Sequence, residues 1–391
     1  MLDRLDPQPA DALLALIKMY ADDQRPGKID LGVGVYRTDD GSTPVFSAIK
    51  SAEAQLLGEQ DSKAYLGPEG DMGFVHALMP YIFGEDATMH GRIRGMQTPG
   101  GTGAVRLALA LAKQSGVKRV LMGVPSWPNH AQILADVGIE VASFQHAGAD
   151  GAADLGALLA ALDGAGPGDA VLLHGCCHNP TGIDYTDDQW DTIAATLESS
   201  GVLPLIDVAY QGLGQGMEED VYGLRAVLRA VPEALIAYSC DKNFGLYRDR
   251  VGAFYVMAQK GDQLDTIMSN ANALARANWS MPPDHGGAAV RIVLRDAGMT
   301  EDWRAELASM RERMGGVRAK LAAAGTAGSL DLTPLGMGHG LFAVLPLDKQ
   351  QIAALRRDHG VYMAGSGRIN VAGLHSGNIA DFIAALSDVA G

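Results

Sequence analysis

The chain has 391 residues, of which 47% are hydrophobic, and its formal net charge is −15 at pH 7. This length and apolar content suffice for a sizeable core, in two or three domains or in one large domain with a smaller companion. The acidic balance argues against nucleic acid or an anionic membrane as the main partner, although a local basic pocket can still bind small anions. We expect no transmembrane segment, because no apolar run approaches ~20 residues. We also expect no targeting segment, because the first residues carry acids where a signal peptide has bases.

The cysteines indicate a reducing environment. There are three of them, Cys176, Cys177 and Cys240, and two are adjacent in the chain. An odd number with this spacing is not typical of a disulfide framework. A cytoplasmic location is the simplest expectation.

The N-terminal part combines helical and strand-like patterns. Apolar spacing predicts a helix over residues 10–19 and another over residues 47–57, and residues 29–36 are strand-like with glycines at 32 and 34. A turn-rich loop follows at residues 65–70. Its Tyr65 is either a packing residue or a functional hydroxyl.

A glycine-rich turn at residues 97–103 opens directly into a helical run at 104–112. Free N–H groups and the positive end of a helix dipole at such a turn suit a phosphate group, and Thr102 adds a hydroxyl. The spacing matches neither the dinucleotide nor the P-loop fingerprint. Close steric packing is the alternative explanation of the glycines.

Strands and helices alternate from there to residue 257, which predicts an α/β fold with a largely parallel sheet. The predicted strands are residues 120–123, 141–144, 170–173, 203–206, 235–238 and 253–257. The predicted helices are residues 131–137, 155–162, 190–197 and 224–230. Ligands of such sheets bind at the carboxyl ends of the strands, so residues that follow a strand are candidates for a site.

Two charged side chains stand at those ends. Asp207 ends one apolar run, where it either caps a turn or pairs with a cationic ligand atom, and Tyr210 follows it. Lys242 follows another apolar run, and burial there would lower the pKa of its amine and make it a nucleophile. An ordinary solvated lysine is the alternative. The cluster at residues 174–178 superficially resembles a metal site, but its spacing does not fit zinc, and we favour a turn.

The pattern changes after residue 300, where one long helix over 303–324 precedes a strand at 341–345 and a helix at 351–357. We expect a smaller α+β domain here, joined by the N-terminal segment. The domain boundaries that we predict are 1–43 for the arm and part of the small domain, 44–305 for the large domain, and 306–391 for the rest of the small domain.

Together these residues resemble the aspartate/aromatic aminotransferases, which are pyridoxal 5′-phosphate enzymes of fold type I. The resemblance runs nearly end to end, and the order of its motifs makes it specific. The motifs are residues 33–36 (VGVY), 65–67 (YLG), 98–104 (TPGGTGA), 125–130 (PSWPNH), 174–182 (HGCCHNPTG), 207–212 (DVAYQG), 242–245 (KNFG), 276–280 (RANWS) and 368–373 (RINVAG).

The resemblance implies roles around the cofactor ring. Lys242 would form a Schiff base with the cofactor aldehyde and then carry the proton of the reaction. Asp207 would pair with the pyridine nitrogen, supported by His130, and Trp127 would stack on the ring. The residues that would hydrogen-bond the phenolic oxygen are Asn179 and Tyr210. The residues that would hold the phosphate are Gly101, Thr102, Ser239, Arg250 and a partner chain's Tyr65.

The resemblance also implies how the substrate binds. Arg368 would clamp the α-carboxylate, helped by Asn179, Trp127 and the backbone at Gly34. Arg276 of a partner chain would meet a side-chain carboxylate. A homodimer with shared active sites follows from these two contributions by the partner. The expected reaction is transamination of tyrosine, phenylalanine and aspartate with 2-oxoglutarate as amino acceptor, and a strict aspartate aminotransferase is the alternative.

The sequence departs from the family pattern at a few positions. Asp241 stands where a small hydroxyl residue is usual, and it either faces the Schiff base or pairs with Arg248 or Arg250. Trp279 and Met281 replace a tyrosine and a small polar residue beside Arg276. Arginine replaces a usual lysine at position 37. The larger, more apolar surroundings of Arg276 argue against strict aspartate specificity.

Two other functions compete with this prediction. A decarboxylase or β-lyase would keep the cofactor, but retaining both Arg276 and Arg368 argues against it, because a decarboxylase leaves the α-carboxylate unclamped. A nucleotide- or phosphate-binding regulator would use the glycine turn without covalent chemistry, and an absorption spectrum separates it from a pyridoxal phosphate enzyme.

Overall fold

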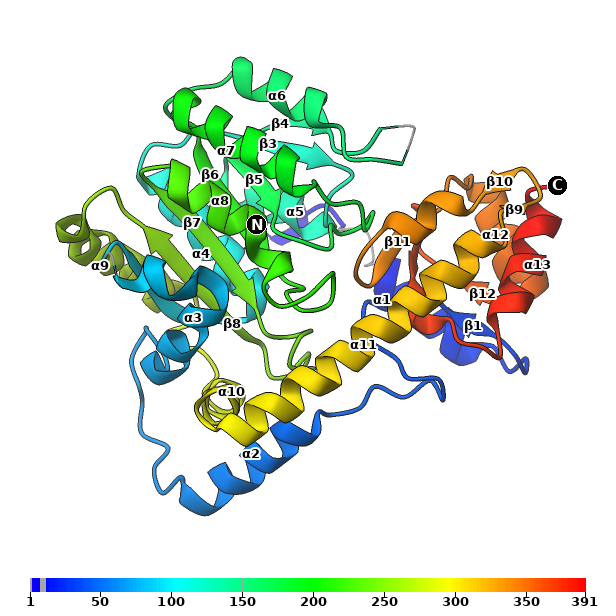
Figure 1. The fold of residues 1–391 in the computed structure, drawn as a ribbon, viewed down its shortest axis with the longest axis horizontal. Coiled ribbons are helices and arrows are strands. Elements are labelled where there is room, and N and C mark those ends of the chain that lie inside the picture. Colours follow the sequence, from blue (N-terminus) through cyan, green and yellow to red (C-terminus); the bar gives the residue numbers. More distant parts are fainter. Residues whose placement is uncertain (1, 8–11, 90, 149–150) are drawn as a thin grey trace. The chain divides into compact units, whose positions relative to one another are not determined.

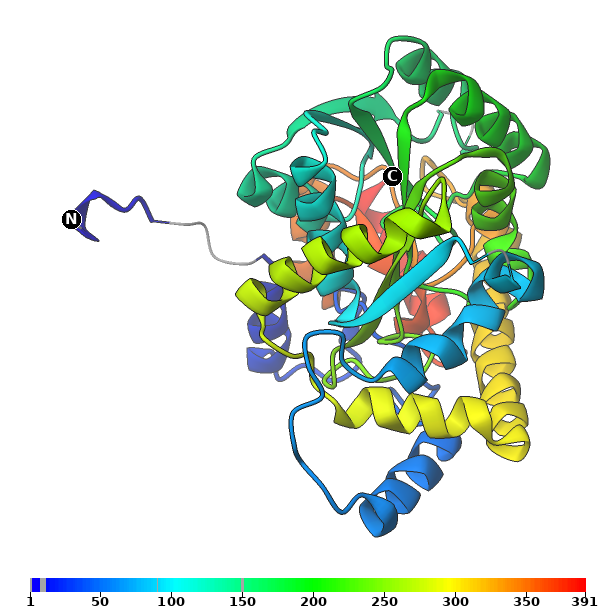
Figure 2. The same cartoon turned by 90° about the vertical axis from the view of Figure 1, so that its left-hand side faces the viewer.

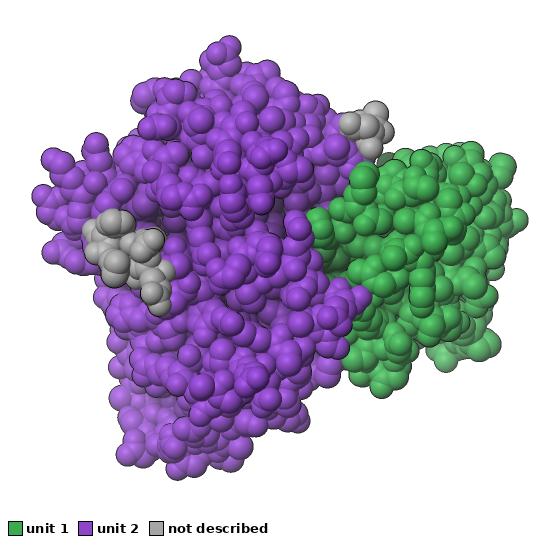
Figure 3. Space-filling view, viewed as in Figure 1, with its two compact units in different colours: residues 1–43, 313–391 green, residues 44–312 purple. Residues whose placement is uncertain are grey.

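The computed structural model describes residues 2–7, 12–89, 91–148 and 151–391 (Figure 1). The chain divides into two compact units, Met1–Thr43 with Arg313–Gly391 and Pro44–Glu312, which Figure 3 colours separately. We keep the predicted domain boundaries, which lie after residues 43 and 305, as a proposal. Residues 10 and 11 of the first predicted helix lie outside the described residues.

A seven-stranded mixed sheet forms the centre of the larger unit. The strands are β2 (Ile93–Pro99), β3 (Arg119–Val124), β4 (Glu140–Gln145), β5 (Asp169–His174), β6 (Leu203–Val208), β7 (Ala234–Ser239) and β8 (Val251–Met257). Their order is β2-β8-β7-β6-β5-β3-β4, and β8 alone runs in the direction opposite to the other six strands. Every residue of β7 and β8 is buried, as expected for strands covered on both faces. The predicted α/β class with a mostly parallel sheet is confirmed.

Helices cover both faces of this sheet (Figure 1). Three of them, α4 (Gly100–Gln114), α5 (Pro128–Val137) and α9 (Leu264–Asn278), share one hydrophobic cluster with alternate residues of the strands. The helices of the other face are α6 (Leu155–Asp163), α7 (Asp187–Ser200) and α8 (Tyr222–Ala230). Helix α4 is apolar nearly all round and buried over most of its length, which places it in the interior of the unit.

The remaining helices of this unit gather beyond β2 and β8. They are α2 (Ser47–Glu59), α3 (Met72–Met89), α10 (His285–Arg295) and α11 (Ala297–Ala323), the last of which contains the boundary between the units. Helix α10 packs on both α2 and α3, and an extended segment of residues 60–71 joins α2 to α3 (Figure 2). Gly84 interrupts α3, with φ at 70°. Of these elements, the sequence patterns predicted only α2 and α11.

The smaller unit is built from short elements. Strand β1 (Ile29–Asp30) runs parallel to β12 (Val361–Tyr362), and β11 (Phe342–Val344) runs antiparallel to β13 (Arg368–Asn370). The others are β9 (Thr326–Ala327), β10 (Leu330–Asp331), α1 (Ala12–Asp22), α12 (Lys349–His359) and α13 (Ile379–Val389). Short 3₁₀ helices lie at Leu2–Arg4, Glu219–Val221, Gly261–Gln263, Thr333–Met337 and Val371–Gly373 in the two units.

The strand predicted over residues 29–36 is wrong beyond Asp30. The side chain of Asn370 donates hydrogen bonds to the carbonyls of Val33 (2.6 Å) and Val35 (2.7 Å). Because a side chain satisfies these carbonyls, the segment needs no strand partner. In the described ranges, no helix is both long and apolar enough to cross a bilayer.

One close backbone contact fixes the glycine-rich turn against the sheet. A Cβ atom on Gly252, in β8, would lie 2.5 Å from the carbonyl carbon of Gly100, at the start of α4, and 2.7 Å from the carbonyl oxygen of Tyr238. Both obstacles are backbone atoms, which cannot rotate away. The absent side chain at position 252 therefore lets the N-terminus of α4 meet the ends of β7 and β8.

We predict that Gly252→Ala lowers the free energy of unfolding by about 2 kcal/mol or more, because overpacking at a rigid backbone contact is destabilising. Urea denaturation followed by circular dichroism measures this. Gly58→Ala is the matched control, since nothing lies within 4 Å of that position in α2. The control gains up to ~1 kcal/mol from helix propensity. Equal midpoints for the Gly252 variant and the wild type would contradict the packing argument.

Candidate active site

A cavity of about 280 Å³ lies at the carboxyl ends of β3, β5, β6 and β7, within the larger unit. Loops that leave parallel strands at one edge of a sheet bring distant residues together here. Its lining comprises Gly101, Thr102, Trp127, Asn129, His174, Cys176, Asn179, Asp207, Ala209, Tyr210, Ser239, Asp241, Lys242, Tyr247 and Arg250. The predicted cofactor residues of the larger unit other than Tyr65 and His130 all belong to this lining.

Lys242 presents an amine to the cavity from the turn after β7. Its Nζ lies 5.2 Å from the centroid of the Tyr210 ring. Burial lowers the pKa of Lys242, and the nearby carboxylates of Asp241 and Asp207 oppose that shift without cancelling it. A larger fraction of the amine is therefore unprotonated than in a solvated lysine, and an unprotonated amine is a nucleophile.

Asp207 is a buried carboxylate that is tied to a chain of polar side chains. Its Oδ2 lies 2.9 Å from His130 Nε2, and His130 Nδ1 lies 2.9 Å from the hydroxyl of Ser126. The same hydroxyl lies 3.2 Å from His174 Nε2, and the backbone N–H of Asn179 donates to His174 Nδ1 at 3.5 Å. The chain runs from the loop after β5 to the end of β6.

The donors in this chain have one consistent direction. Burial lowers the pKa of His174 well below its usual value, so this ring is neutral. Because its Nδ1 accepts from a backbone amide, its Nε2 carries the proton and donates to Ser126. With His130 in its neutral form, the Ser126 hydroxyl donates to His130 Nδ1 and His130 Nε2–H donates to Asp207, so Asp207 is the acceptor at the end of the chain.

The polar side chains above Asp207 include one buried atom without a partner. Asn179 donates from Nδ2 to the hydroxyl of Tyr210 at 3.4 Å. Among the residues that the structure describes, its Oδ1 has no hydrogen-bond partner. Trp127 stands edge-on to His130, with ring centroids 5.0 Å apart, and lines the same cavity. A buried unsatisfied amide in a cavity indicates a polar ligand.

The opposite end of the cavity is suited to an anion. Helix α4 begins there, and its N-cap residue Pro99 provides no side-chain acceptor for the N–H groups of the first turn. A Cβ atom on Gly101 would lie 2.9 Å from Cβ of Ser239, so the start of α4 and the last residue of β7 are in close contact. Arg250 lines this end as well. Free N–H groups, a hydroxyl and a guanidinium together are typical of a phosphate site.

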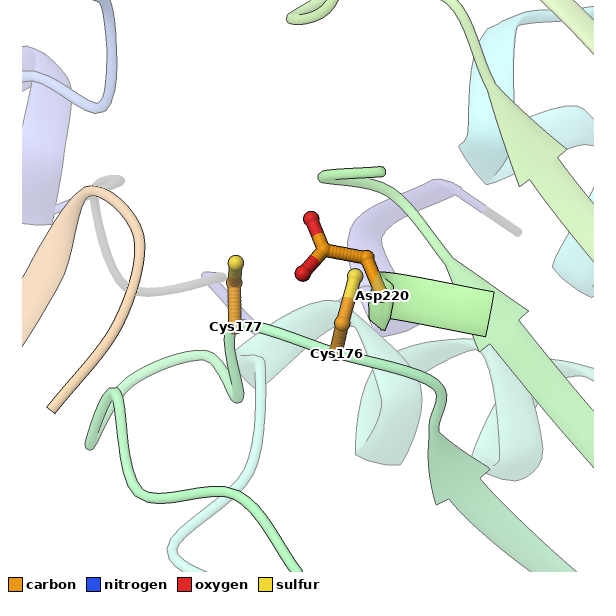
Figure 4. Close-up of side chains that lie close together, drawn as sticks. All are labelled: Cys176, Cys177 and Asp220. Carbon is orange, nitrogen blue, oxygen red and sulfur yellow. The ribbon is translucent and has the colours of Figure 1, made fainter. Parts of the chain in front are cut away.

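Cys176, Cys177 and Asp220 form a second cluster, in which their side-chain ligand atoms lie within 4.8 Å of one another (Figure 4). Asp220 accepts backbone N–H groups of Gly212 (2.8 Å), Gly214 (2.9 Å), Gln215 (2.7 Å) and Gly216 (3.4 Å). Both thiols are buried, and burial raises the pKa of Cys177 well above its usual value. A protonated thiol and a saturated carboxylate are poor metal ligands. The cluster is therefore a structural clamp, in which the hydrogen bonds to Asp220 fix the loop that follows Tyr210.

Gly34 and Arg368 belong to the smaller unit, where both contact Phe342. The guanidinium carbon of Arg368 lies 4.5 Å from the centroid of the Phe342 ring, and its Nη2 donates to the carbonyl of Gly32 at 2.8 Å. A Cβ atom on Gly34 would lie 2.7 Å from the same ring. The ring therefore supports the guanidinium, and a side chain at position 34 would displace it.

Tyr65 and Arg276 lie on the surface of the larger unit and do not line the cavity. Tyr65 is 92% exposed, and Arg276 is an exposed residue in the last turn of α9 that donates to the hydroxyl of Ser280. The backbone N–H of Leu66 contacts the sulfur of Met281 at 3.2 Å. The segments that carry Tyr65 and Arg276 are therefore side by side.

Two residues of the polar chain were not predicted as part of the site. His174 was assigned only to a turn, and Ser126 was assigned no role. His174 is the last residue of β5, and Ser126 directly precedes Trp127, so their positions at strand ends were the available signal. Their contacts with each other join two separate loops and leave no trace in local sequence spacing.

The chain belongs to the aminotransferase class I and II family, whose model matches residues 26–386. It is 47% identical over 382 residues to a tyrosine aminotransferase of Rhizobium meliloti (strain 1021), covering 97% of this chain and 98% of that protein. It is 41% identical over 394 residues to an aspartate aminotransferase of Escherichia coli (strain K12), covering 99% of each. The family and these relatives establish the chain as an aminotransferase.

Solved structures agree over the whole chain. An aromatic amino acid aminotransferase with 3-indolebutyric acid has a TM-score of 0.94 at 39% identity, covering 100% of both chains. An aromatic-amino-acid aminotransferase from Burkholderia pseudomallei, covalently bound to pyridoxal phosphate, has a TM-score of 0.96 at 31% identity, again covering 100% of both chains. The fold expected from the family resemblance is confirmed.

We predict that Asp220→Ala lowers the free energy of unfolding by about 3 kcal/mol, because buried backbone N–H groups lose their charged acceptor. Asp220→Asn should have a smaller effect, since it retains one acceptor oxygen. Urea denaturation of the three proteins measures the difference. Addition of Zn²⁺ should leave the wild-type melting temperature unchanged. A zinc-dependent rise, lost in Asp220→Ala, would contradict the assignment of this cluster as a structural clamp.

Proposed function

We propose that this aminotransferase binds pyridoxal 5′-phosphate in the cavity and transfers amino groups between aromatic or dicarboxylic L-amino acids and 2-oxoglutarate. The observation that carries the proposal is the pairing, in one cavity, of a lysine with a lowered pKa and a buried carboxylate that accepts from His130. The relatives named tyrosine, aromatic-amino-acid and aspartate aminotransferase support the two substrate classes.

The residues present fit this cofactor. An aldehyde needs an amine, which Lys242 supplies, and a pyridine nitrogen needs a carboxylate, which Asp207 supplies. The unsatisfied amide of Asn179 and the hydroxyl of Tyr210 suit a phenolic oxygen, and Trp127 offers a flat apolar face. The residues suited to the phosphate are Gly101, Thr102, Ser239 and Arg250.

When bound, pyridoxal phosphate supplies an electron sink for the carbanion formed at the substrate Cα. Lys242 moves the proton, because its neutral amine can accept a proton from Cα and then donate it. Asp207 would hold a proton at the pyridine nitrogen, and the chain from His174 through Ser126 and His130 would fix the position of that carboxylate. Tyr210 and Asn179 orient the ring by its phenolic oxygen.

The substrate residues are part of the same proposal. Arg368 binds the α-carboxylate in two parallel hydrogen bonds. Because Gly34 has no side chain, its backbone lies close to the ring of Phe342, which Arg368 also contacts. Arg276 of a partner subunit binds a side-chain carboxylate, and Tyr65 of that subunit reaches the phosphate. A single partner can supply both, because the contact between Leu66 and Met281 keeps their segments together.

A homodimer and a cytoplasmic location complete the proposal. The surface positions of Tyr65 and Arg276, which do not line the cavity of their own chain, support the dimer. The location rests on the three cysteines, which are all free thiols and buried.

Trp279 and Met281 favour a dual specificity over strict action on aspartate. Trp279 is partly buried and packs against the hydrophobic cluster that α4, α5 and α9 share with the sheet. Its indole N–H has no hydrogen-bond partner among the described residues. These two side chains give a large ring an apolar surface beside Arg276. When an aromatic substrate binds, Arg276 can stay exposed and bonded to Ser280, as it is in the chain by itself.

We predict that Lys242→Ala abolishes turnover and covalent attachment of the cofactor, because among the described residues Lys242 is the one lysine that lines the cavity. The residual rate should be at least about a thousandfold below wild type, as expected when a nucleophile and proton carrier is removed. Steady-state rates and the visible absorption spectrum measure the two effects. Lys50→Ala, an exposed change on α2, is the control and should behave as wild type. Turnover near the wild-type rate would contradict the assignment.

We predict that Arg276→Leu lowers kcat/KM for aspartate at least about a hundredfold, because a substrate carboxylate loses a charged partner. The half-reaction with phenylalanine should change little. Arg276→Lys keeps the charge but loses the bidentate fork, so its kcat/KM for aspartate should lie between those of the wild type and Arg276→Leu. Single-turnover rates with each amino acid separate the effects. Equal losses on both substrates would mean that Arg276 is structural and that the dual-specificity argument is wrong.

A further inference from the structure

Asp241 directly precedes Lys242 and lines the same cavity, yet its side chain is only 2% exposed. In the family that the sequence resembles, a small hydroxyl residue is usual here. A carboxylate next to a site for a phosphate group is unexpected, because like charges repel at short range. Its contacts explain what it does instead.

Both oxygens of Asp241 are used within the anion end of the cavity. Oδ2 accepts from Nη1 of Arg250 at 2.5 Å, and Oδ1 accepts the backbone N–H of Val251 at 3.0 Å. The same Nη1 also donates to the carbonyl of Tyr247 at 3.1 Å. Asp241 therefore pairs with Arg250, which is one of the two alternatives that the sequence left open.

The pair lies against the start of α4. A Cβ atom on Gly100 would meet Nη2 of Arg250 at 2.6 Å and Oδ2 of Asp241 at 2.8 Å. The backbone N–H of Asp241 donates to the hydroxyl of Ser239 at 3.2 Å. Asp241 thus contacts two of the groups proposed for the phosphate, Ser239 and Arg250, and lies beside the third, the N-terminus of α4.

Arg250 has an unusual backbone that a fixed side chain helps to stabilise. Its φ is 57°, in the left-handed region that residues other than glycine rarely adopt. Such a conformation costs of order 1–3 kcal/mol and persists where surrounding contacts determine it. The Asp241 carboxylate supplies two of these contacts, one to the guanidinium and one to the next residue, Val251.

We propose that Asp241 sets the charge at the phosphate end of the cavity: by pairing with Arg250 it offsets the guanidinium charge, and it thereby weakens the binding of the cofactor phosphate. This inference rests on the proposed function. The two formal charges of the pair sum to zero, so the phosphate is attracted mainly by the N–H groups of α4 and the hydroxyls of Ser239 and Thr102. A chain with a hydroxyl at position 241 would present a net positive charge instead.

The test compares wild type with Asp241→Asn and Asp241→Ser in the full-length chain freed of cofactor. Isothermal titration calorimetry gives the affinities for three probes: pyridoxal 5′-phosphate, pyridoxal and inorganic phosphate. Both variants should bind inorganic phosphate and pyridoxal 5′-phosphate about tenfold or more tightly than wild type, because one negative charge next to an anion is gone. Affinity for pyridoxal, which has no phosphate, should change less, because only the effect of Asp241 on the pKa of Lys242 remains.

The asparagine variant is nearly isosteric, so it tests charge with the least change in shape, and urea denaturation checks that both variants are folded. Unchanged or weaker binding of the two phosphate probes by folded Asp241→Asn would overturn the inference. An equal change for pyridoxal would also overturn it, since the effect would then arise at the ring or at Lys242. Failure of the wild type to bind pyridoxal 5′-phosphate at all would instead refute the proposed function, and inorganic phosphate would still report on Asp241.

Discussion

The site depends on holding two ionisable groups, the carboxylate of Asp207 and the amine of Lys242, in a cavity that removes water from both. An isolated buried charge is costly unless hydrogen bonds or a counter-charge compensate it. For Asp207 the compensation is the donor chain that ends at His130 Nε2, whose direction follows from a backbone amide at its far end. For Lys242 the compensation by the carboxylates of Asp241 and Asp207 is incomplete, so burial lowers the pKa of the amine. The structure thus gives one group a hydrogen-bond donor and makes the other a nucleophile, which is the division of roles that a carbonyl cofactor with a basic ring nitrogen requires.

The sheet explains why these groups meet. Strands β5, β6 and β7 are neighbours and parallel, so the residues that end them lie side by side although up to 68 positions separate His174 from Lys242 in the chain. The glycine contact between α4 and β8 brings the helix N-terminus to the same edge. An amine and a carboxylate for the ring, and helix N–H groups for a phosphate, then belong to one cavity. The Asp241–Arg250 pair lies in the same cavity, and the carboxylate of Asp241 also opposes the lowering of the Lys242 pKa.

Much of this arrangement was predictable because it depends on local patterns. Apolar runs located six of the seven central strands, and polar residues just after them located Asp207, Tyr210 and Lys242. Strand β2 was missed, since Arg94 and Gly95 interrupt its apolar pattern. The order of donors from His174 to Asp207 was not predictable, because it requires contacts between loops that are distant in sequence. The partner of Asp241 was left open for the same reason: two arginines follow it in the chain, and only the geometry of the turn selects Arg250.

The most direct test of the central claim is to locate the covalent bond between cofactor and protein. The enzyme with bound pyridoxal 5′-phosphate is reduced with borohydride, digested and analysed by peptide mass spectrometry. We predict one stoichiometric modification, on the peptide that contains Lys242, and no reduction product in a Lys242→Ala sample treated in parallel. A stoichiometric label on any other lysine, or none on the wild-type protein, would contradict this account of the cavity.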